Sequence, residues 1–286
     1  MARDQARRIV SLCPSNTEIL FALGLGERVV GVDNDSDHPP EVARLPRLGP
    51  DLDVDVAKVA ALEPDLVVAS LSVPGMERNL LRLESAGLPY IVLHSQRLDE
   101  IYRDIVLVAE LAGVPERGRA LVADLRARIA ALAARAATAP ARPRLYWEWW
   151  PKPLITPGRP SWITDLSALA HAENAFADLP KESDVITGDE VIARDPDVVL
   201  VCWCGARRPV ALDKIVARPG WGRIRAVREG RVHVVWEGLF GRPGPRLVEG
   251  FAWLVRAAHP DLFGDCPSAA GFPAGRSEAT APQPVR

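Results

Sequence analysis

The sequence predicts an α/β fold of two lobes with mainly parallel sheets, bridged by a long α-helix and separated by a cleft. Three observations predict it. Short apolar strands alternate with helices in both halves of the 286-residue chain, as in parallel sheets that are covered on both faces. One pattern occurs twice, as "DVAKVAALEPDLVVAS" (55–70) and "DEVIARDPDVVLVCWCG" (189–205). Between the halves, a stretch rich in Ala, Leu, Arg and Glu has strong helix-forming composition.

The first lobe is expected over residues 1–97. Its first strand, Ile9–Leu12, ends at Pro14, and "SNTEILFALGLG" then forms a helix. Ser15 and Glu18 have the spacing of a capping box at the start of this helix. A strand at Val29–Val32, an acidic loop, the helix and strand of the first repeat, and a further helix and strand in "MERNLLRLESAGLPYIVLHS" complete the lobe.

The rest of the chain divides at its helical stretch. The bridging helix is expected over 98–138, with a kink or division at 113–115, where Gly and Pro occur. The second lobe, 139–263, contains the strand "RLYWEWW", the helix "SWITDLSALAHAEN", the second repeat, the strand "RVHVVW" and a last helix, "RLVEGFAWLVRAAHP". The tail, 264–286, is rich in Pro, Ala, Gly and Ser and is predicted to be disordered.

Composition excludes several classes of protein. The net charge of −2 and the pI of about 6.2 do not indicate a nucleic-acid partner. No apolar run approaches the roughly 20 residues of a membrane span. We expect a monomer, cytoplasmic as the sequence stands because no signal peptide is apparent, or periplasmic or extracellular if an export signal was trimmed. The four cysteines do not form a disulfide framework in a chain of this length.

Tryptophan is concentrated in the second half of the chain, which holds all eight. Ligands of open α/β sheets bind beyond the carboxyl ends of the strands. Four tryptophans stand at or near such ends and are candidates to line the cleft: Trp149, Trp150, Trp203 and Trp236. Indole rings suit large planar ligands. Trp147, Trp221 and Trp253 are better explained as core residues.

His38 is the most informative polar residue of the first lobe. It stands in the loop "SDHPPE", and neutral imidazole is a common ligand of cobalt and iron. Two interpretations remain open: His38 packs on or coordinates a metal-containing ligand, or it is a loop residue bonded to a neighbouring aspartate. The acidic loops of the first lobe and arginines of the second, Arg242 and Arg246 among them, predict a cleft of mixed charge.

Several segments together resemble a known family. "RIVSLCPSNTEILFALGLGERVVGV", "SDHPPE", "KVAALEPDLVVAS", the mid-chain helix, "PLITPG" and "VIARDPDVVLV" resemble the substrate-binding proteins of ABC importers for vitamin B12, haem and ferric siderophores, most closely the cobalamin-binding branch. The resemblance covers about residues 7–260. It implies two lobes on a rigid helical bridge, a ligand held between them with little hinge motion, and an ABC permease as partner.

The resemblance also identifies a departure. Importer-docking members present one carboxylate on each lobe to arginines of the permease. Asp189 stands at that position in the second repeat, whereas the matching residue of the first repeat is Ala57. Glu18 is an alternative for the first lobe, but its capping-box spacing explains it equally well. The chain is therefore expected either to serve an importer or to be a relative that only retains the binding fold.

The sequence predicts a non-enzymatic binding protein with no intrinsic cofactor. Cobalamin or a related corrinoid is the first choice of ligand, because corrin side chains are mostly neutral amides that suit a lining of both charges. The predicted ligand-binding residues are Pro14, Ser15, His38, Trp149, Trp150, Trp203, Trp236, Arg242 and Arg246. The alternatives are a haem or ferric-siderophore binder, and an intracellular metal-binding or sensing protein that uses Cys13, His38 and Cys204. No phosphate-binding loop, nucleophile elbow or HExxH motif indicates an enzyme.

Overall fold

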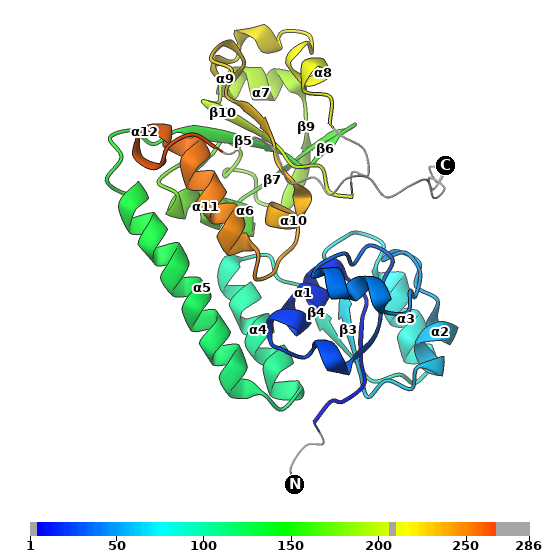
Figure 1. The fold of residues 1–286 in the computed structure, drawn as a ribbon. Coiled ribbons are helices and arrows are strands. Elements are labelled where there is room, and N and C mark those ends of the chain that lie inside the picture. Colours follow the sequence, from blue (N-terminus) through cyan, green and yellow to red (C-terminus); the bar gives the residue numbers. More distant parts are fainter. Residues whose placement is uncertain (1–4, 206–209, 267–286) are drawn as a thin grey trace.

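The computed structural model describes residues 5–205 and 210–266. Two α/β lobes lie one above the other and a pair of helices runs along their side (Figure 1). This is the fold class that the sequence predicts. The proposed boundary of the disordered tail lies at residue 264, and all but its first three residues fall outside the described part of the chain.

The first lobe is built on a four-stranded parallel sheet of order β2-β1-β3-β4. Its strands are short and mostly buried, as the apolar runs predict: β1 (Ile9–Ser11), β2 (Val29–Val32), β3 (Leu66–Ser70) and β4 (Tyr90–Leu93). The connecting helices are α1 (Pro14–Ala22), α2 (Val56–Ala61) and α3 (Glu77–Ser85), with 3-10 turns at η1 (Gly26–Arg28) and η2 (Pro40–Arg44).

The second lobe contains two sheets. The larger is parallel, of order β11-β10-β5-β8, and consists of β5 (Arg144–Glu148), β8 (Glu173–Asn174), β10 (Val198–Val201) and β11 (Val232–Val234). The smaller is antiparallel and consists of β6 (Trp150–Pro151), β7 (Leu154–Pro157) and β9 (Ser183–Ile186). The sequence did not predict it: the expected strand "RLYWEWW" is interrupted at Trp149, and its last residue begins β6.

Helices cover these sheets and extend to the end of the described chain. They are α6 (Trp162–Leu169), α7 (Gly188–Arg194), α8 (Leu212–Val216), η3 (Trp221–Arg223), α9 (Arg225–Arg228), α10 (Glu237–Phe240), α11 (Leu247–Ala258) and α12 (Pro260–Phe263).

The repeated segment performs the same structural task in both lobes. In each copy the acidic residue before the proline has a left-handed backbone, at Glu63 (φ 45°) and Asp195 (φ 39°), and ends a short helix. The aspartate after the proline then accepts backbone N–H groups at the start of the neighbouring central strand. Asp65 binds the amides of Arg7 and Arg8, and Asp197 binds the amide of Arg144 at 2.8 Å. The repeat therefore ties a helix–strand unit to the first strand of its own sheet.

Two helices form the bridge instead of one continuous helix. α4 (Leu98–Leu111) and α5 (Pro115–Ala136) are separated at Gly113, which has φ +69°, so the expected division at 113–115 is present. The two helices pack closely where Gly118 faces Ala109: a β-carbon on Gly118 would lie only 2.5 Å from that of Ala109. α5 is the long helix along the left side of Figure 1 and reaches the second lobe.

The largest hydrophobic core belongs to both lobes and to the bridge. It runs from Ile9 and Ile19 through Ile105 and Leu125 to Trp147 and other residues of the second lobe. Each lobe also has a smaller core on the other face of its sheet. The packing therefore makes the lobes and the helical pair one continuous apolar unit.

Candidate functional site

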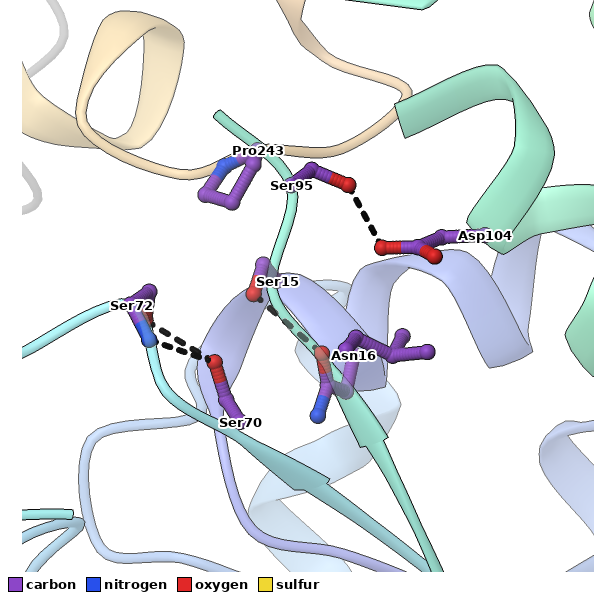
Figure 2. Close-up of a pocket in the computed structure, with 8 residues that line it drawn as sticks. Ser15, Asn16, Ser70, Ser72, Ser95, Asp104 and Pro243 are labelled. Carbon is purple, nitrogen blue, oxygen red and sulfur yellow. Dashed lines mark hydrogen bonds between the residues drawn. The ribbon is translucent and has the colours of Figure 1, made fainter. Parts of the chain in front are cut away.

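A small polar pocket lies where the strands of the first lobe end and the second lobe covers them. Around it Figure 2 shows Ser15 and Asn16 of α1, Ser70 at the end of β3, Ser72 just after it, and Ser95 and Asp104, with Pro243 of the second lobe on the rim. Its volume is about 10 Å³, room for roughly one water molecule. The lobes therefore meet directly at this edge of the sheet.

Hydrogen bonds fix the polar residues of this edge. The Asn16 side-chain amide donates to the carbonyl oxygens of Val68 and Ala69, both at 3.1 Å, which holds the start of α1 on β3. The Ser95 hydroxyl donates to Asp104 Oδ2 at 2.5 Å. Burial raises the pKa of Asp104.

The loop that carries Asp37 and His38 is held by a buried carboxylate. Asp33 Oδ1 accepts the backbone N–H groups of Asp35 and Ser36, and its other oxygen accepts the Ser36 hydroxyl. Burial raises the pKa of Asp33 to about 6. This network turns the loop so that Asp37 reaches the second lobe.

The second lobe approaches through the segment between α10 and α11. We call Gly241–Arg246, "GRPGPR", the strap. It follows β11 and α10 closely, so it starts at the carboxyl edge of the larger sheet. Pro243 lies on the rim of the polar pocket, and a β-carbon on Gly244 would be 3.6 Å from the carbonyl oxygen of Ser15. The strap therefore rests on the first turn of α1.

Arg242 is the centre of the contact between the lobes. Its guanidinium binds Glu18 Oε1 at 3.0 Å and Asp37 Oδ1 at 2.6 Å, both in the first lobe. It also binds Glu237 Oε1 of its own lobe at 2.8 Å. The side chain is 8% exposed. Burial opposes the charge of Arg242, but the carboxylates of Glu237, Asp37 and Glu18 around it raise its pKa.

Arg246 lies beside this cluster and stacks on Trp236, with its guanidinium carbon 4.2 Å from the ring centroid. Its Nη1 is 3.6 Å from Glu18 Oε1, too long for a hydrogen bond. Among the described residues, neither Nε nor Nη1 of Arg246 has a hydrogen-bond partner, and the same is true of Glu18 Oε2, although all three atoms are buried.

Glu18 corrects the sequence interpretation. The capping-box prediction is wrong, because α1 begins at Pro14 with Cys13 as its N-cap and has no side-chain cap. The Glu18 side chain is 2% exposed and faces the arginines of the other lobe. Burial raises its pKa to about 7, against the opposing effect of Arg242 and Arg246. A carboxylate that is buried to this extent is not available to a partner protein in this arrangement.

The predicted site residues divide into two groups. The first group meets at the interlobe contact and consists of Ser15, Trp236, Arg242 and Arg246. Pro14 is buried at the start of α1, in the turn on which the strap rests. His38 is near them, since both Arg246 and Arg242 influence its titration; burial and the Arg246 charge lower its pKa. Its ring is therefore neutral at pH 7.

The other tryptophans have different surroundings. Trp149 packs on Trp162 with ring centroids 5.6 Å apart. Trp150 is 43% exposed on the small antiparallel sheet. Trp203 donates its indole N–H to Glu148 Oε1 at 2.9 Å. The interlobe contact described above does not include these three rings.

Glu148 anchors Trp203 through a buried ion pair. It is fully buried, and its carboxylate accepts hydrogen bonds from both Nη atoms of Arg218, at 2.5 and 2.9 Å. Tyr146 donates its hydroxyl to the same carboxylate at 3.1 Å. The pairing of Glu148 with a distant arginine was not apparent from the sequence.

Asp189 is exposed at the second residue of α7, and Ala57 is exposed at the second residue of α2. The two positions therefore correspond in structure as they do in the repeat. Asp189 is distant from Arg242 in the chain, and none of the ion pairs described for Arg242 includes it.

The alternative metal site that uses Cys13, His38 and Cys204 has no support. Within residues 5–205 and 210–266 there is no group of three or more His, Cys, Asp or Glu side chains that could hold a metal ion. The Cys13 thiol lies 3.3 Å from the Ser15 hydroxyl, and burial raises the pKa of both Cys13 and Cys204.

Sequence reasoning missed three residues of the interlobe cluster, Glu18, Asp37 and Glu237. Asp37 had a signal, since it is next to His38 in the singled-out loop. Glu237 directly follows Trp236 at a strand end, which is the position rule that selected Trp236 itself. Glu18 was considered only as a helix cap or a docking carboxylate, because nothing in its local sequence indicates a partner in the other lobe.

A search against protein families decides the broad identity of the chain, because a model for periplasmic binding proteins matches residues 9–236. The chain belongs to this periplasmic binding protein family. Among curated members, an uncharacterised ABC transporter substrate-binding lipoprotein of Bacillus subtilis, YvrC, is 32% identical over 91% of this chain and 82% of its own length. A vitamin B12-binding protein of Vibrio cholerae is 28% identical over 85% of this chain and 86% of its own.

Solved structures of periplasmic binding proteins agree with the fold. The haem-binding protein RhuT of Roseiflexus sp. RS-1 has a TM-score of 0.77 and 31% identity, over 89% of this chain and 98% of that one. The vitamin B12 binding protein BtuF of Vibrio cholerae has a TM-score of 0.73 and 26% identity, over 88% and 96%. No helix in the part of the chain that the structure describes is long and apolar enough to cross a membrane.

Proposed function

We propose that this chain is the substrate-binding component of an ABC importer, or a relative of one, and that it binds a corrinoid between its lobes without catalysing a reaction. The family supports a small-molecule ligand and a permease partner. The names of curated relatives support vitamin B12, and those of solved structures include both B12 and haem binders. The choice among these ligands therefore depends on the interlobe chemistry.

The charge balance of the interlobe contact carries the choice of a corrinoid. Within the described residues, the guanidiniums of Arg242 and Arg246 face the carboxylates of Glu18, Asp37 and Glu237. A ligand rich in carboxylates, such as haem or many siderophores, favours arginines that are not already neutralised. A ligand of neutral amides needs hydrogen-bond donors and acceptors together, which this contact supplies.

Binding requires the strap to separate from α1. The pocket between them holds roughly one water molecule, so a large ring system enters only when the strap and the Arg242 ion pairs give way. The Trp236 ring, stacked on Arg246, then offers an apolar face to the ligand. Pro14, Ser15 and His38 border the same opening, with the neutral His38 imidazole able to coordinate cobalt.

Ligand titration tests the proposal. Cyanocobalamin, haemin and a ferric siderophore are added separately, and tryptophan quenching and visible absorption are followed. We expect cyanocobalamin to bind most tightly and Trp236→Ala to weaken binding by about tenfold, because one large aromatic contact is lost. Tighter binding of haemin or the siderophore than of cyanocobalamin contradicts the choice of a corrinoid.

Asp189→Asn serves as the matched control. Its side chain is exposed on α7, so the affinity for cyanocobalamin should remain that of the wild type. If Asp189 docks a permease, the same variant should stimulate the ATPase of the reconstituted cognate permease less than the wild type does. Ligand binding and docking are thereby measured separately.

A further inference from the structure

Two buried side chains of the interlobe contact have hydrogen-bonding capacity left over. Glu18 Oε2 is an acceptor without a partner among the described residues, and Arg246 Nε and Nη1 are donors in the same situation. Buried polar atoms are normally satisfied, and leaving them unpaired is costly. The Glu18 residue is 4% exposed, so bulk water does not satisfy it in the closed arrangement.

The free acceptor and the free donors lie side by side. Arg246 Nη1 is 3.6 Å from the other oxygen of the same carboxylate, Glu18 Oε1. That oxygen is already used by Arg242 Nη1, at 3.0 Å. Arg242 in turn is engaged by Asp37 and Glu237. Among the described residues of this cluster, Glu18 Oε2 and Arg246 therefore keep hydrogen-bonding capacity for an incoming group, although Glu249 Oε2 lies 3.6 Å from Arg246 Nε.

We propose that Glu18 and Arg246 together bind a primary carboxamide of the ligand. The amide NH₂ donates to Glu18 Oε2, and the amide carbonyl oxygen accepts from Arg246. This inference rests on the proposed function and refines it, since it selects ligands whose ring substituents are amides over ligands whose substituents are acids. Glu18 is the residue that sets this preference.

A carboxylate in the same place is disfavoured for two reasons. Above pH 7, where Glu18 is mainly ionised, a ligand carboxylate has no hydrogen to donate to Glu18 Oε2, so an acceptor would face an acceptor. It also adds a negative charge where the carboxylates of Glu18, Asp37 and Glu237 already outnumber the described guanidiniums of Arg242 and Arg246.

The strap is built to uncover this pair. Gly244 lies over the carboxylate, and a β-carbon there would be 4.0 Å from Glu18 Oε2. Because glycine has no side chain, the strap covers this oxygen at residue 244 with backbone alone. Movement of residues 241–245 therefore exposes Glu18, while Arg246, at the N-terminus of α11 and stacked on Trp236, stays beside it.

The test compares cyanocobalamin with its monocarboxylates, in each of which a single ring carboxamide is hydrolysed to a carboxylate. Dissociation constants are measured by tryptophan quenching for wild type and Glu18→Gln at about pH 8.5, above the Glu18 pKa of about 7. In the wild type we expect at least one monocarboxylate to bind about tenfold or more weakly than cyanocobalamin. In Glu18→Gln that ratio should approach one, because a glutamine amide can donate to a carboxylate.

Arg242→Gln is the control for a general effect on closure. Its guanidinium is engaged by Glu18, Asp37 and Glu237, so its loss should change both affinities and leave the cluster more negative. The ratio should therefore stay at or above the wild-type value, in contrast to its fall in Glu18→Gln. If Glu18→Gln does not fold, Glu18→Asp, which withdraws the carboxylate by one methylene, should lower the ratio in the same way.

Two results overturn the inference while the proposed function stands. One is equal binding of cyanocobalamin and every monocarboxylate by the wild type. The other is an unchanged ratio in Glu18→Gln. Failure of cyanocobalamin itself to bind removes the proposed function and this inference with it, so the two failures are distinguishable.

Discussion

At the scale of single residues, the structure gives buried charges more importance than the tryptophan rings that the sequence predicts to line the cleft. Glu18, Arg242 and Glu148 are each nearly or fully buried and each belongs to an ion-pair cluster. Buried ion pairs are weak contributors to net stability but costly to break on one side. They therefore fix geometry: Arg242 joins the lobes, and Glu148 holds the Trp203 indole.

The titration of Glu18 predicts a pH-dependent stability. Its pKa in the folded protein is about 7 against a usual value of 4.5, so folding takes up a proton between these values. The associated stability is fully present below about pH 4.5 and is lost as the pH rises through about 7. We expect the free energy of unfolding of the wild type to fall between about pH 5 and pH 8 by more than that of Glu18→Gln, by on the order of 2 kcal/mol.

Urea denaturation at the two pH values measures this difference. Asp33, whose pKa is also raised, is present in both proteins and contributes equally to both. The groups that face Glu18 are Arg242, Arg246 and Asp37. Parallel pH dependence of wild type and variant would show that Glu18 does not take up a proton on folding.

At the scale of elements, the bridge depends on one close helix contact. The absence of a side chain at Gly118 lets α5 approach α4, since a β-carbon there would lie 2.5 Å from Ala109 Cβ and 3.4 Å from Val106 Cα. Overpacking of a core costs typically about 1–3 kcal/mol. In a helix interior, alanine is more favourable than glycine by about 1 kcal/mol, which offsets part of this cost.

We therefore expect Gly118→Ala to lower the free energy of unfolding by up to about 2 kcal/mol, although alanine is the better helix former. Equilibrium urea denaturation measures it. Gly222→Ala is the matched control, because nothing lies within 4 Å of the added β-carbon, and its effect should be within about 0.5 kcal/mol. A more stable Gly118→Ala protein would mean that the helices separate without cost.

The elements also show what the sequence could predict. Val29–Val32 is the predicted strand, and the strands of both repeats lie where their apolar runs stand, because local periodicity determines such segments. The antiparallel β6, β7 and β9 escaped prediction, since "WWPKPLITP" pairs partly with residues about thirty positions later. For the same reason the role of Glu18 could not be predicted from the sequence, because its partner Arg242 is 224 residues away.

At the scale of the whole molecule, the closed arrangement of the lobes depends on Arg242. Its removal leaves Glu18, Asp37 and Glu237 facing one another without their shared counter-charge. Uncompensated buried charges of this kind cost about 3–5 kcal/mol. Separation of the strap from α1 relieves the repulsion by admitting water.

We expect ligand-free Arg242→Gln to have a larger radius of gyration than the wild type in small-angle X-ray scattering. Arg82→Gln is the control: it removes an exposed ion pair with Asp53 inside the first lobe and should leave the scattering curve unchanged. If Arg242→Gln scatters as the wild type does, the apolar contacts alone hold the lobes together.

The domain boundaries at 97, 138 and 263 remain a proposal, and the shared core gives them a particular meaning. Ile19, Ile105, Leu125 and Trp147 belong to one apolar cluster that crosses those boundaries. Each lobe expressed by itself would expose the part of this cluster that it normally shares. A gene split at Gly113, where the backbone already turns between helices, would therefore yield two fragments. Each fragment would be prone to aggregation alone, and the two would reassemble when produced in the same cell.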